Sequence, residues 1–257
     1  LTGNGKLSDL FPWPSVVEDR NIMGATAVAI PGVVSGMDLA HQKFGRMPWK
    51  SLVLPAAKLA DEGLLVDWYT TLVTAASARL LSRDADTAAT FLEEGVWPIA
   101  GDWTSTKERH LNQKIFSQTL TQIAELGADT FYKGDVAKAL VKDIRSKGGC
   151  VSLEDLASYS AEWAEPLVIN YRNGKVFATP GLTGGPTLAR ALGLLEERYK
   201  PASKLPDADT YTAFAHSLND AFKLRFEEMG DYESPKSPGC TTHFSVVDRH
   251  GNMCSVT

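Results

Sequence analysis

A hydroxyl residue directly after a turn-rich segment stands out near the C-terminal end of the sequence. Residues 239–248 read Gly-Cys-Thr-Thr-His-Phe-Ser-Val-Val-Asp, and residues 234–239 are rich in serine, proline and glycine. The residues from Thr241 onward are typical of a β-strand. A strand fixes its first residues, whereas a flexible segment before it can move away once the chain is cut. This arrangement is the one that an N-terminal nucleophile requires.

Thr241 can supply both groups that such chemistry needs. A threonine hydroxyl is a weak nucleophile and needs a base beside it. Cleavage of the bond after Cys240 would give Thr241 a free α-amine, whose ordinary pKa of about 8 lets it take the hydroxyl proton at neutral pH. We therefore expect neither a metal nor an organic cofactor. On local sequence alone, the same residues also fit an ordinary strand that opens with two threonines because threonine favours strands.

The motif at residues 241–248, followed by Gly-Asn at 251–252, resembles the start of the small subunit in γ-glutamyltransferases. In that family the first threonine of the Thr-Thr-His triplet is both the self-cleavage point and the catalytic nucleophile. The resemblance therefore implies that Thr241 is the catalytic residue and that the Cys240–Thr241 bond is the processing site.

Further blocks follow the order of this family through most of the chain. The resemblance divides the chain into a large-subunit portion, residues 1–240, and the start of the small, catalytic subunit, residues 241–257. The matching blocks include Pro31-Gly32, Phe44-Gly45, Pro48-Trp49, Phe131-Tyr132, Gly148-Gly149 and Asp155-Leu156.

The resemblance also implies a fold and an activity. The implied fold is α+β, the four-layer αββα sandwich of N-terminal-nucleophile hydrolases, incomplete in this chain. The implied reaction is acyl transfer from γ-glutamyl amides such as glutathione to water or an amine, through an autocatalytically exposed threonine. The implied partners are a small γ-glutamyl substrate and the remainder of the small subunit, which would form a heterodimer with the large subunit after processing.

Several family features are expected outside this sequence or differ within it. The arginine that holds the substrate carboxylate would lie before Leu1, and the other substrate and oxyanion residues would lie beyond Thr257. We therefore expect residues 1–257 alone to be inactive, and a non-catalytic scaffold of the same ancestry remains the rival hypothesis. Residues 180–185 read Pro-Gly-Leu-Thr-Gly-Gly, a variant that also resembles the related cephalosporin and glutaryl acylases, so such an acylase is an alternative.

Composition narrows the function classes. The chain is 44% hydrophobic and 22% charged, with a formal net charge of −5, which is typical of a soluble globular protein and argues against a nucleic-acid partner. No apolar run approaches the roughly 20 residues of a membrane-spanning helix. The three cysteines form no C-x-x-C pair, so no metal site is predicted.

Two segments close to the expected chemistry have two interpretations each. His243 lies two residues after Thr241, hence on the same face of a strand, where it could orient the nucleophile or serve only as a structural hydrogen-bonding group. Residues 184–187, Gly-Gly-Pro-Thr, could bind an anion at a helix N-terminus or form only a tight turn.

Local patterns predict a helix-rich first part. Residues 1–25 contain turn residues and are expected to be loop, whereas residues 31–149 have a helical pattern. Within that range, one helix has its apolar residues at 136–144 and another at 111–123, and glycines that end a helix follow both.

The remaining elements include strands. Ser152 and Asp155 form the pattern of a capping box at the start of a short helix. Residues 167–171 and 176–179 are β-rich and flank Asn173-Gly174, the strongest short-range hairpin signal. The last expected elements are helices over 188–195 and 207–228 and strands over 241–247 and 253–257, joined by a turn at 248–252.

Overall fold

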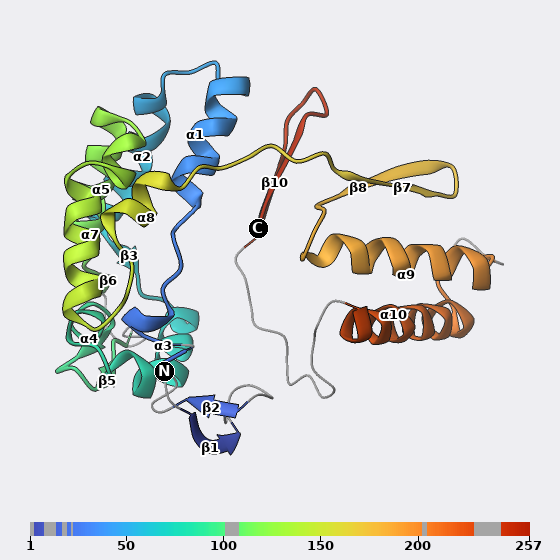
Figure 1. Ribbon diagram of the computed structural model, residues 1–257, viewed down its shortest axis with the longest axis horizontal. Coiled ribbons are helices and arrows are strands. Elements are labelled where there is room, and N and C mark those ends of the chain that lie inside the picture. The colour runs from blue at the N-terminus through green and yellow to red at the C-terminus, as the bar shows by residue number, and fades with distance from the viewer. Residues whose placement is uncertain are drawn as a thin grey trace. The chain divides into compact units, whose positions relative to one another are not determined.

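The computed structural model describes residues 3–7, 14–16, 20–21, 23–100, 108–201, 205–228 and 243–257. The chain divides into two compact units (Figure 1). The helical unit is Arg20–Glu162, and the split unit combines Leu1–Asp19 with Trp163–Thr257.

The helical unit consists mainly of α-helices joined by short connections (Figure 1). Its helices are η2 (Ala25–Ala27, a 3-10 turn), α1 (Val33–Phe44), α2 (Trp49–Glu62), α3 (Trp68–Leu81), α4 (Ala85–Phe91), α5 (Lys114–Leu126), α6 (Asp129–Tyr132), α7 (Asp135–Ser146) and α8 (Leu153–Ser158). Its strands are β3 (Leu64–Leu65) paired with β6 (His110–Leu111), and β4 (Leu92–Glu93) paired with β5 (Trp97–Pro98), both antiparallel.

Helices α2 and α5 pack closely because small residues line their contact. Ala57 and Ala60 on α2 and Ala124 on α5 are buried. The Ser117 hydroxyl donates to the Ala57 carbonyl at 2.8 Å, and the Trp49 indole N–H donates to the Ile123 carbonyl at 3.0 Å. These bonds satisfy side-chain polar groups at the contact and fix the position of one helix on the other.

The core of the helical unit lies around α6, α7 and α8. Its buried members are Tyr132, Ala137, Val141, Ile144, Val151 and Leu156. The Tyr132 hydroxyl donates to the Pro31 carbonyl at 2.7 Å and accepts from the Ser35 backbone N–H at 3.0 Å. Burial raises the pKa of Tyr132 above its ordinary value, so the ring remains a neutral phenol that can both donate and accept at neutral pH.

Within its described residues, the split unit contains three antiparallel strand pairs and two long helices. The strand pairs are β1 (Gly3–Leu7) with β2 (Pro14–Val16), β7 (Leu167–Tyr171) with β8 (Gly174–Ala178), and β9 (Phe244–Val247) with β10 (Met253–Val256). The helices are α9 (Gly184–Arg198) and α10 (Ala208–Glu228).

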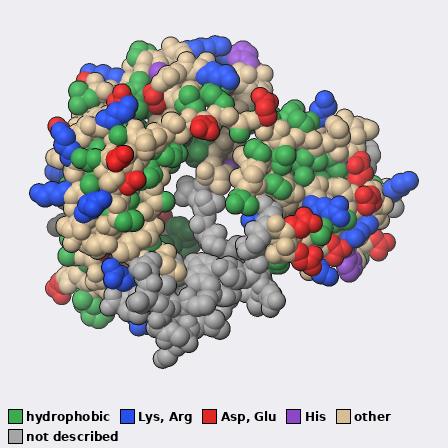
Figure 2. Space-filling view, in the orientation of Figure 1, with side chains coloured by type: hydrophobic (Ala, Val, Ile, Leu, Met, Phe, Trp, Pro, Cys, Tyr) green, Lys and Arg blue, Asp and Glu red, His purple; other side chains and the backbone are tan. Residues whose placement is uncertain are grey.

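Helix α9 packs against α10 and against both strands of the β7–β8 hairpin. Ala191, Leu194 and Ala221 form the buried cluster between the helices, and an ion pair joins Arg198 to Asp220 with Nη1 and Oδ2 2.6 Å apart. Apolar side chains that remain exposed gather over the β7–β8 hairpin and α9 in the view of Figure 2; they include Val168, Phe177 and Leu182.

The predicted helix-rich α+β character is confirmed, since every described strand belongs to a two-stranded antiparallel sheet and helices predominate. The capping box is also confirmed: the Ser152 hydroxyl accepts from the Asp155 N–H, and the Asp155 carboxylate accepts from the Ser152 N–H. The helices predicted around 136–144, 188–195 and 207–228 are present as α7, α9 and α10.

Three local predictions were wrong in detail. Residues 1–25 are not only loop, because β1 pairs with β2 there; their turn-rich composition carries no alternation that would reveal the pairing. Leu111 lies in β6 rather than in the helix that follows, because Gly63 and Leu64 bring a partner strand beside it. The hairpin turn is centred on Arg172 and Asn173.

That hairpin differs from the predicted one by a shift of the turn. Tyr171 pairs with Gly174, so Gly174 begins β8, and the strand starts two residues earlier than expected. Arg172 adopts a φ of 52°, a left-handed conformation that is uncommon outside glycine. The Arg172 N–H donates to the Glu196 carboxylate on α9 at 2.8 Å, and this tertiary bond supports the less common turn.

Candidate active site

The predicted nucleophile lies at the edge of what the structure describes. Thr241, Cys240 and the bond between them are outside the described residues, which resume at His243. The described part of the predicted small-subunit start is the β9–β10 hairpin, residues 243–257 (Figure 1). The candidate active site is therefore built from this hairpin.

The register of the hairpin determines which side chains share a face. Ser245 lies opposite Ser255, and Phe244 lies opposite Val256. Because side chains alternate along a strand, residues 243, 245, 255 and 257 share one face, and Phe244, Val246, Cys254 and Val256 lie on the other. We call the face of residues 243, 245, 255 and 257 the polar face.

His243 is the centre of a hydrogen-bonded cluster on that polar face. Its Nδ1 lies 2.7 Å from the Thr257 hydroxyl, and its Nε2 lies 3.0 Å from the Ser245 hydroxyl and 3.2 Å from the Ser255 hydroxyl. The two serine hydroxyls are themselves 3.3 Å apart. Both ring nitrogens therefore have partners, and the bonds to Thr257 and Ser255 cross from β9 to β10.

The turn of the hairpin is held by Asp248. One carboxylate oxygen accepts from the N–H groups of His250 and Asn252, at 2.8 and 2.9 Å, and the other accepts from the Asn252 side chain at 2.8 Å. These bonds, the Asn252 side chain foremost, hold the pKa of Asp248 below its usual range. Gly251 takes a φ of 82°, which glycine adopts without strain. The predicted turn at 248–252 is confirmed.

This hairpin has little burial to hold it. All four residues of β9 are exposed, including Phe244, Val246 and Val247. An isolated two-stranded hairpin is only marginally stable in water. Beside the main-chain pairing of β9 with β10, the polar cluster at one end and the Asp248 turn at the other are therefore the side-chain interactions within the described residues that set its shape.

The glycine loop before α9 is a tight turn. The Thr183 hydroxyl accepts from the Gly185 N–H at 3.1 Å and donates to the Thr179 carbonyl at 2.9 Å. A side chain at Gly185 would overlap the Thr179 carbonyl oxygen, so the loop requires glycine there. Residues 184–187 are not a turn of their own but the first turn of α9, whose N-terminus Thr183 caps, so the tight-turn prediction applies only to the loop before them.

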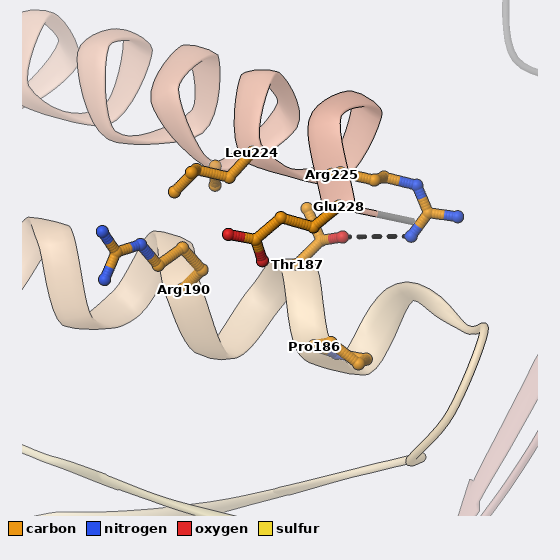
Figure 3. A pocket seen from close by; sticks show the side chains of 7 residues that line it. Pro186, Thr187, Arg190, Leu224, Arg225 and Glu228 are labelled. Carbon is orange, nitrogen blue, oxygen red and sulfur yellow. Dashed lines mark hydrogen bonds between the residues drawn. The ribbon is translucent and has the colours of Figure 1, made fainter. Parts of the chain in front are cut away.

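A pocket of about 310 Å³ lies between α9 and α10. Arg225, one of the residues that line it, donates to the Thr187 hydroxyl at 3.0 Å and to the Thr183 carbonyl at 2.9 Å. Figure 3 shows the Arg225–Thr187 bond at one end of the pocket and the Arg190 side chain at the other, with Glu228 between them. These contacts hold the C-terminal end of α10 against the start of α9, and so fix the position of the last described residues before the segment that contains Thr241.

In the part of the chain that the structure describes, no group of three or more histidine, cysteine or acidic side chains is placed to hold a metal ion. Cys150 and Cys254 are free, exposed thiols. Among the described helices, none is long and apolar enough to cross a membrane.

Comparison with known proteins places the chain in a family. The family model described as Gamma-glutamyltranspeptidase matches residues 8–240, most of the chain. The chain belongs to the gamma-glutamyltranspeptidase family. The resemblance drawn from the sequence motifs is thereby confirmed.

Individual members of the family agree with this assignment. The glutathione hydrolase proenzyme of Pseudomonas aeruginosa is 29% identical over 94% of this chain, and the crystal structure of Helicobacter pylori gamma-glutamyltranspeptidase superposes with a TM-score of 0.76 at 28% identity over 90% of this chain. The chain covers 48% of the former and 64% of the latter chain. It therefore spans about half the length of the curated relatives that it matches.

A related acylase is also similar. The crystal structure of cephalosporin acylase from Bacillus halodurans superposes with a TM-score of 0.67 at 26% identity, over 77% of this chain and 37% of the acylase. The expected α+β fold of a gamma-glutamyltranspeptidase, incomplete in this chain, agrees with both structural neighbours.

Sequence reasoning found part of the candidate site and missed part. It singled out Thr241 and noted that His243 would share its face. It did not single out Ser255 and Thr257, which meet His243 only because β10 pairs back onto β9 in this register. The sequence does contain a signal for them: polar residues stand at 255 and 257 after the turn, with the same spacing as those at 243 and 245 before it.

Proposed function

We propose that this chain carries the processing site and the nucleophile of a γ-glutamyl hydrolase or transferase, with Thr241 in both roles. The observation that supports this most directly is the place of the Thr-Thr-His-Phe-Ser motif. In a member of the gamma-glutamyltranspeptidase family, its two threonines come directly before the described hairpin, His243 follows them, and its Phe and Ser are the first two residues of strand β9.

The first step is self-cleavage. The Thr241 hydroxyl oxygen attacks the carbonyl carbon of Cys240 while the bond from that carbon to the Thr241 nitrogen breaks, and the hydroxyl proton passes to the departing nitrogen. Water then hydrolyses the ester that remains on Oγ. The products are a carboxylate at Cys240 and a free α-amine on Thr241, which becomes the base of the mature enzyme.

The second step is acyl transfer. The α-amine of Thr241 takes the hydroxyl proton as Oγ attacks the γ-glutamyl carbonyl carbon, and the same proton passes to the amine that leaves. The γ-glutamyl ester is then cleaved by water, which gives hydrolysis, or by an acceptor amine, which gives transfer. No step requires electrons from outside, and both nucleophile and base come from one residue.

The proposed processing divides the protein at residue 240. Residues 1–240 would belong to the large subunit and residues 241–257 would begin the small subunit, and the two would remain together as a heterodimer. The word proenzyme in the names of the Pseudomonas aeruginosa and Escherichia coli relatives supports such processing. The units defined by packing divide elsewhere, after Asp19 and Glu162, so the proposed cut falls inside the split unit.

The substrate is proposed from the same relatives. Glutathione hydrolase names favour a γ-glutamyl amide as the donor. The likeness to the Bacillus halodurans cephalosporin acylase and the Thr-Gly-Gly variant at residues 183–185 favour glutaryl or cephalosporin side-chain amides as the alternative. A panel of γ-glutamyl-anilide and glutaryl-amide substrates distinguishes the two by their relative kcat/KM.

The decisive experiment follows the intact mass and the N-terminal sequence of the full-length protein during maturation. Wild-type protein should yield a chain that begins at Thr241. Thr241→Ala should remain uncut, because the attacking hydroxyl is gone, whereas Thr241→Ser should be cut more slowly. A new N-terminus at another residue, or cleavage of the alanine variant, would refute the proposal.

A further inference from the structure

We infer that His243 is a positioning residue for Thr241. His243 would act by hydrogen bonding across the two strands of the hairpin at the end that is nearest to Thr241 in the sequence. This inference rests on the proposed role of Thr241 and deepens it. The observation behind it is the cluster in which one imidazole contacts three hydroxyls, those of Ser245, Ser255 and Thr257.

The geometry of the cluster assigns a distinct role to each ring nitrogen. Nδ1 has a single, short contact of 2.7 Å to Thr257, directly across the hairpin, whereas Nε2 faces two serine hydroxyls at 3.0 and 3.2 Å. A neutral imidazole has one N–H and one acceptor nitrogen. Because each hydroxyl can donate or accept, either tautomer gives one bond from Nδ1 to Thr257 across the hairpin and one from Nε2 to a serine.

The position of the cluster explains why it should matter to Thr241. It lies at the open end of the hairpin, two residues from Thr241, while the Asp248 turn closes the other end. Within the described residues, packing of apolar side chains does not stabilise that open end, because Phe244 to Val247 are all exposed. The bond from His243 to Thr257 is therefore the last described connection between the strands before the nucleophile.

Positioning of a reacting group has large consequences for rate. Self-cleavage requires the Thr241 oxygen to reach the carbonyl carbon of Cys240 along a narrow path, and a displacement of about 1 Å can slow a reaction roughly 100-fold. Loss of the cluster should loosen the open end of the hairpin and misplace Thr241. Because the cluster is exposed, its contribution to global stability should be small by comparison.

The test measures the rate of self-cleavage in the full-length precursor for three substitutions at one position. His243→Phe keeps a ring but removes every bond, and should slow cleavage roughly 10- to 100-fold. His243→Asn places an amide near the position of Nδ1 and should recover much of that loss through Thr257. His243→Gln reaches only toward the serines and should recover less.

A matched control comes from the same hairpin. His250 is also exposed, lies in the turn, and contacts only the side chain of Arg249 through its ring within the described structure. His250→Phe is therefore the same chemical change away from the polar face, and it should cleave at the wild-type rate. Thermal unfolding of each precursor, followed by circular dichroism, separates positioning from loss of structure.

The outcomes separate the two claims. Any of three results would overturn the positioning role. His243→Phe could cleave at the wild-type rate, or His250→Phe could slow cleavage as much as His243→Phe does. The third such result is slower cleavage accompanied by a matching fall in the unfolding temperature. If His243→Phe does not fold, Thr257→Val must slow cleavage in a folded precursor, and a wild-type rate there also overturns it. Cleavage of Thr241→Ala would refute the nucleophile instead, whatever His243 does.

Discussion

Two regions of this molecule are stabilised by different interactions: burial of apolar side chains in the helical unit, and hydrogen bonds between exposed groups in the β9–β10 hairpin. Around α6, α7 and α8, apolar side chains such as Leu156 and Ile144 are buried, and the Tyr132 hydroxyl beside them has two backbone partners. In the β9–β10 hairpin, the side chains are exposed and the shape depends on bonds among His243, its hydroxyl partners and Asp248.

This difference predicts that one region mainly sets the free energy of unfolding and the other mainly sets the reaction rate. Burial of a large apolar side chain contributes about 1.5–3 kcal/mol, so the core around Leu156 determines whether the helical unit folds. Exposed hydrogen bonds contribute far less to folding but can set the place of a reacting atom. Substitutions in the core should therefore change the free energy of unfolding, whereas substitutions around Thr241 should change rate at nearly constant stability.

The largest effect is expected from the nucleophile itself. Thr241→Ala, prepared as a two-chain form with the cut already made, should lose several orders of magnitude in kcat, at about 1.4 kcal/mol for each tenfold. Its unfolding temperature should equal that of the wild type. The measurement is turnover of a γ-glutamyl-anilide, and a near-normal rate would contradict the assignment of Thr241.

The next effect tests the core side of the comparison. Leu156 is fully buried, and Leu156→Ala should lower the free energy of unfolding by about 2–5 kcal/mol through lost burial and the cavity left behind. Leu126→Ala is the control, because Leu126 is 69% exposed and should change stability by less than about 0.5 kcal/mol. Urea unfolding followed by circular dichroism measures both; equal effects would contradict the assignment of the core.

A smaller effect is expected at the polar group inside the core. Tyr132→Phe removes the bonds to the Pro31 carbonyl and the Ser35 N–H and leaves both without that partner. The cost should be about 1–3 kcal/mol. Tyr69→Phe, at an exposed tyrosine, provides the baseline. If the two variants unfold at the same urea concentration, the contacts of Tyr132 contribute nothing measurable.

The smallest effect concerns a charge cluster in the same unit. The Lys147 ammonium lies 2.8 Å from an oxygen of Asp84, 2.9 Å from Asp86 and 3.3 Å from Asp143. The bond from Lys147 lowers the pKa of Asp84 to about 2, and its carboxylate partners raise the pKa of Lys147. Because these side chains are about one-third exposed or more, Lys147→Met should cost only about 1 kcal/mol or less at neutral pH.

The pH dependence of that cost has a definite sign. The lowered pKa of Asp84 means that its contribution is present above its ordinary value of 3.8 and is lost as the pH falls through about 2. The raised pKa of Lys147 means that its contribution is complete below its ordinary value of 10.5 and is lost only above it. The difference in the free energy of unfolding between wild type and Lys147→Met should therefore be constant near neutral pH and should decrease below about pH 4. A difference that increases in acid would contradict this.

Some of the fold followed from the sequence because its signals are local. The capping box at Ser152 and Asp155 joins atoms only three residues apart, and Gly127 ends α5 with a φ of 83° that other residues rarely adopt. The β-rich residues after Thr241 likewise predicted β9, and the composition of residues 248–252 predicted the turn before β10. The candidate nucleophile was identified in the same way, from a motif whose chemistry lies within one residue and its neighbour.

Only the tertiary structure decided which distant segments meet. Strand β3 pairs with β6, Tyr132 reaches back to Pro31 and Ser35, and Arg172 takes a left-handed turn that Glu196 supports. These contacts depend on the packing of whole helices, and no window of a few residues contains both partners. The sequence alone therefore predicted Thr241 as the nucleophile, while the pairing of β9 with β10 decided that His243 meets hydroxyls from both strands, because side chains share a face only once a register is set.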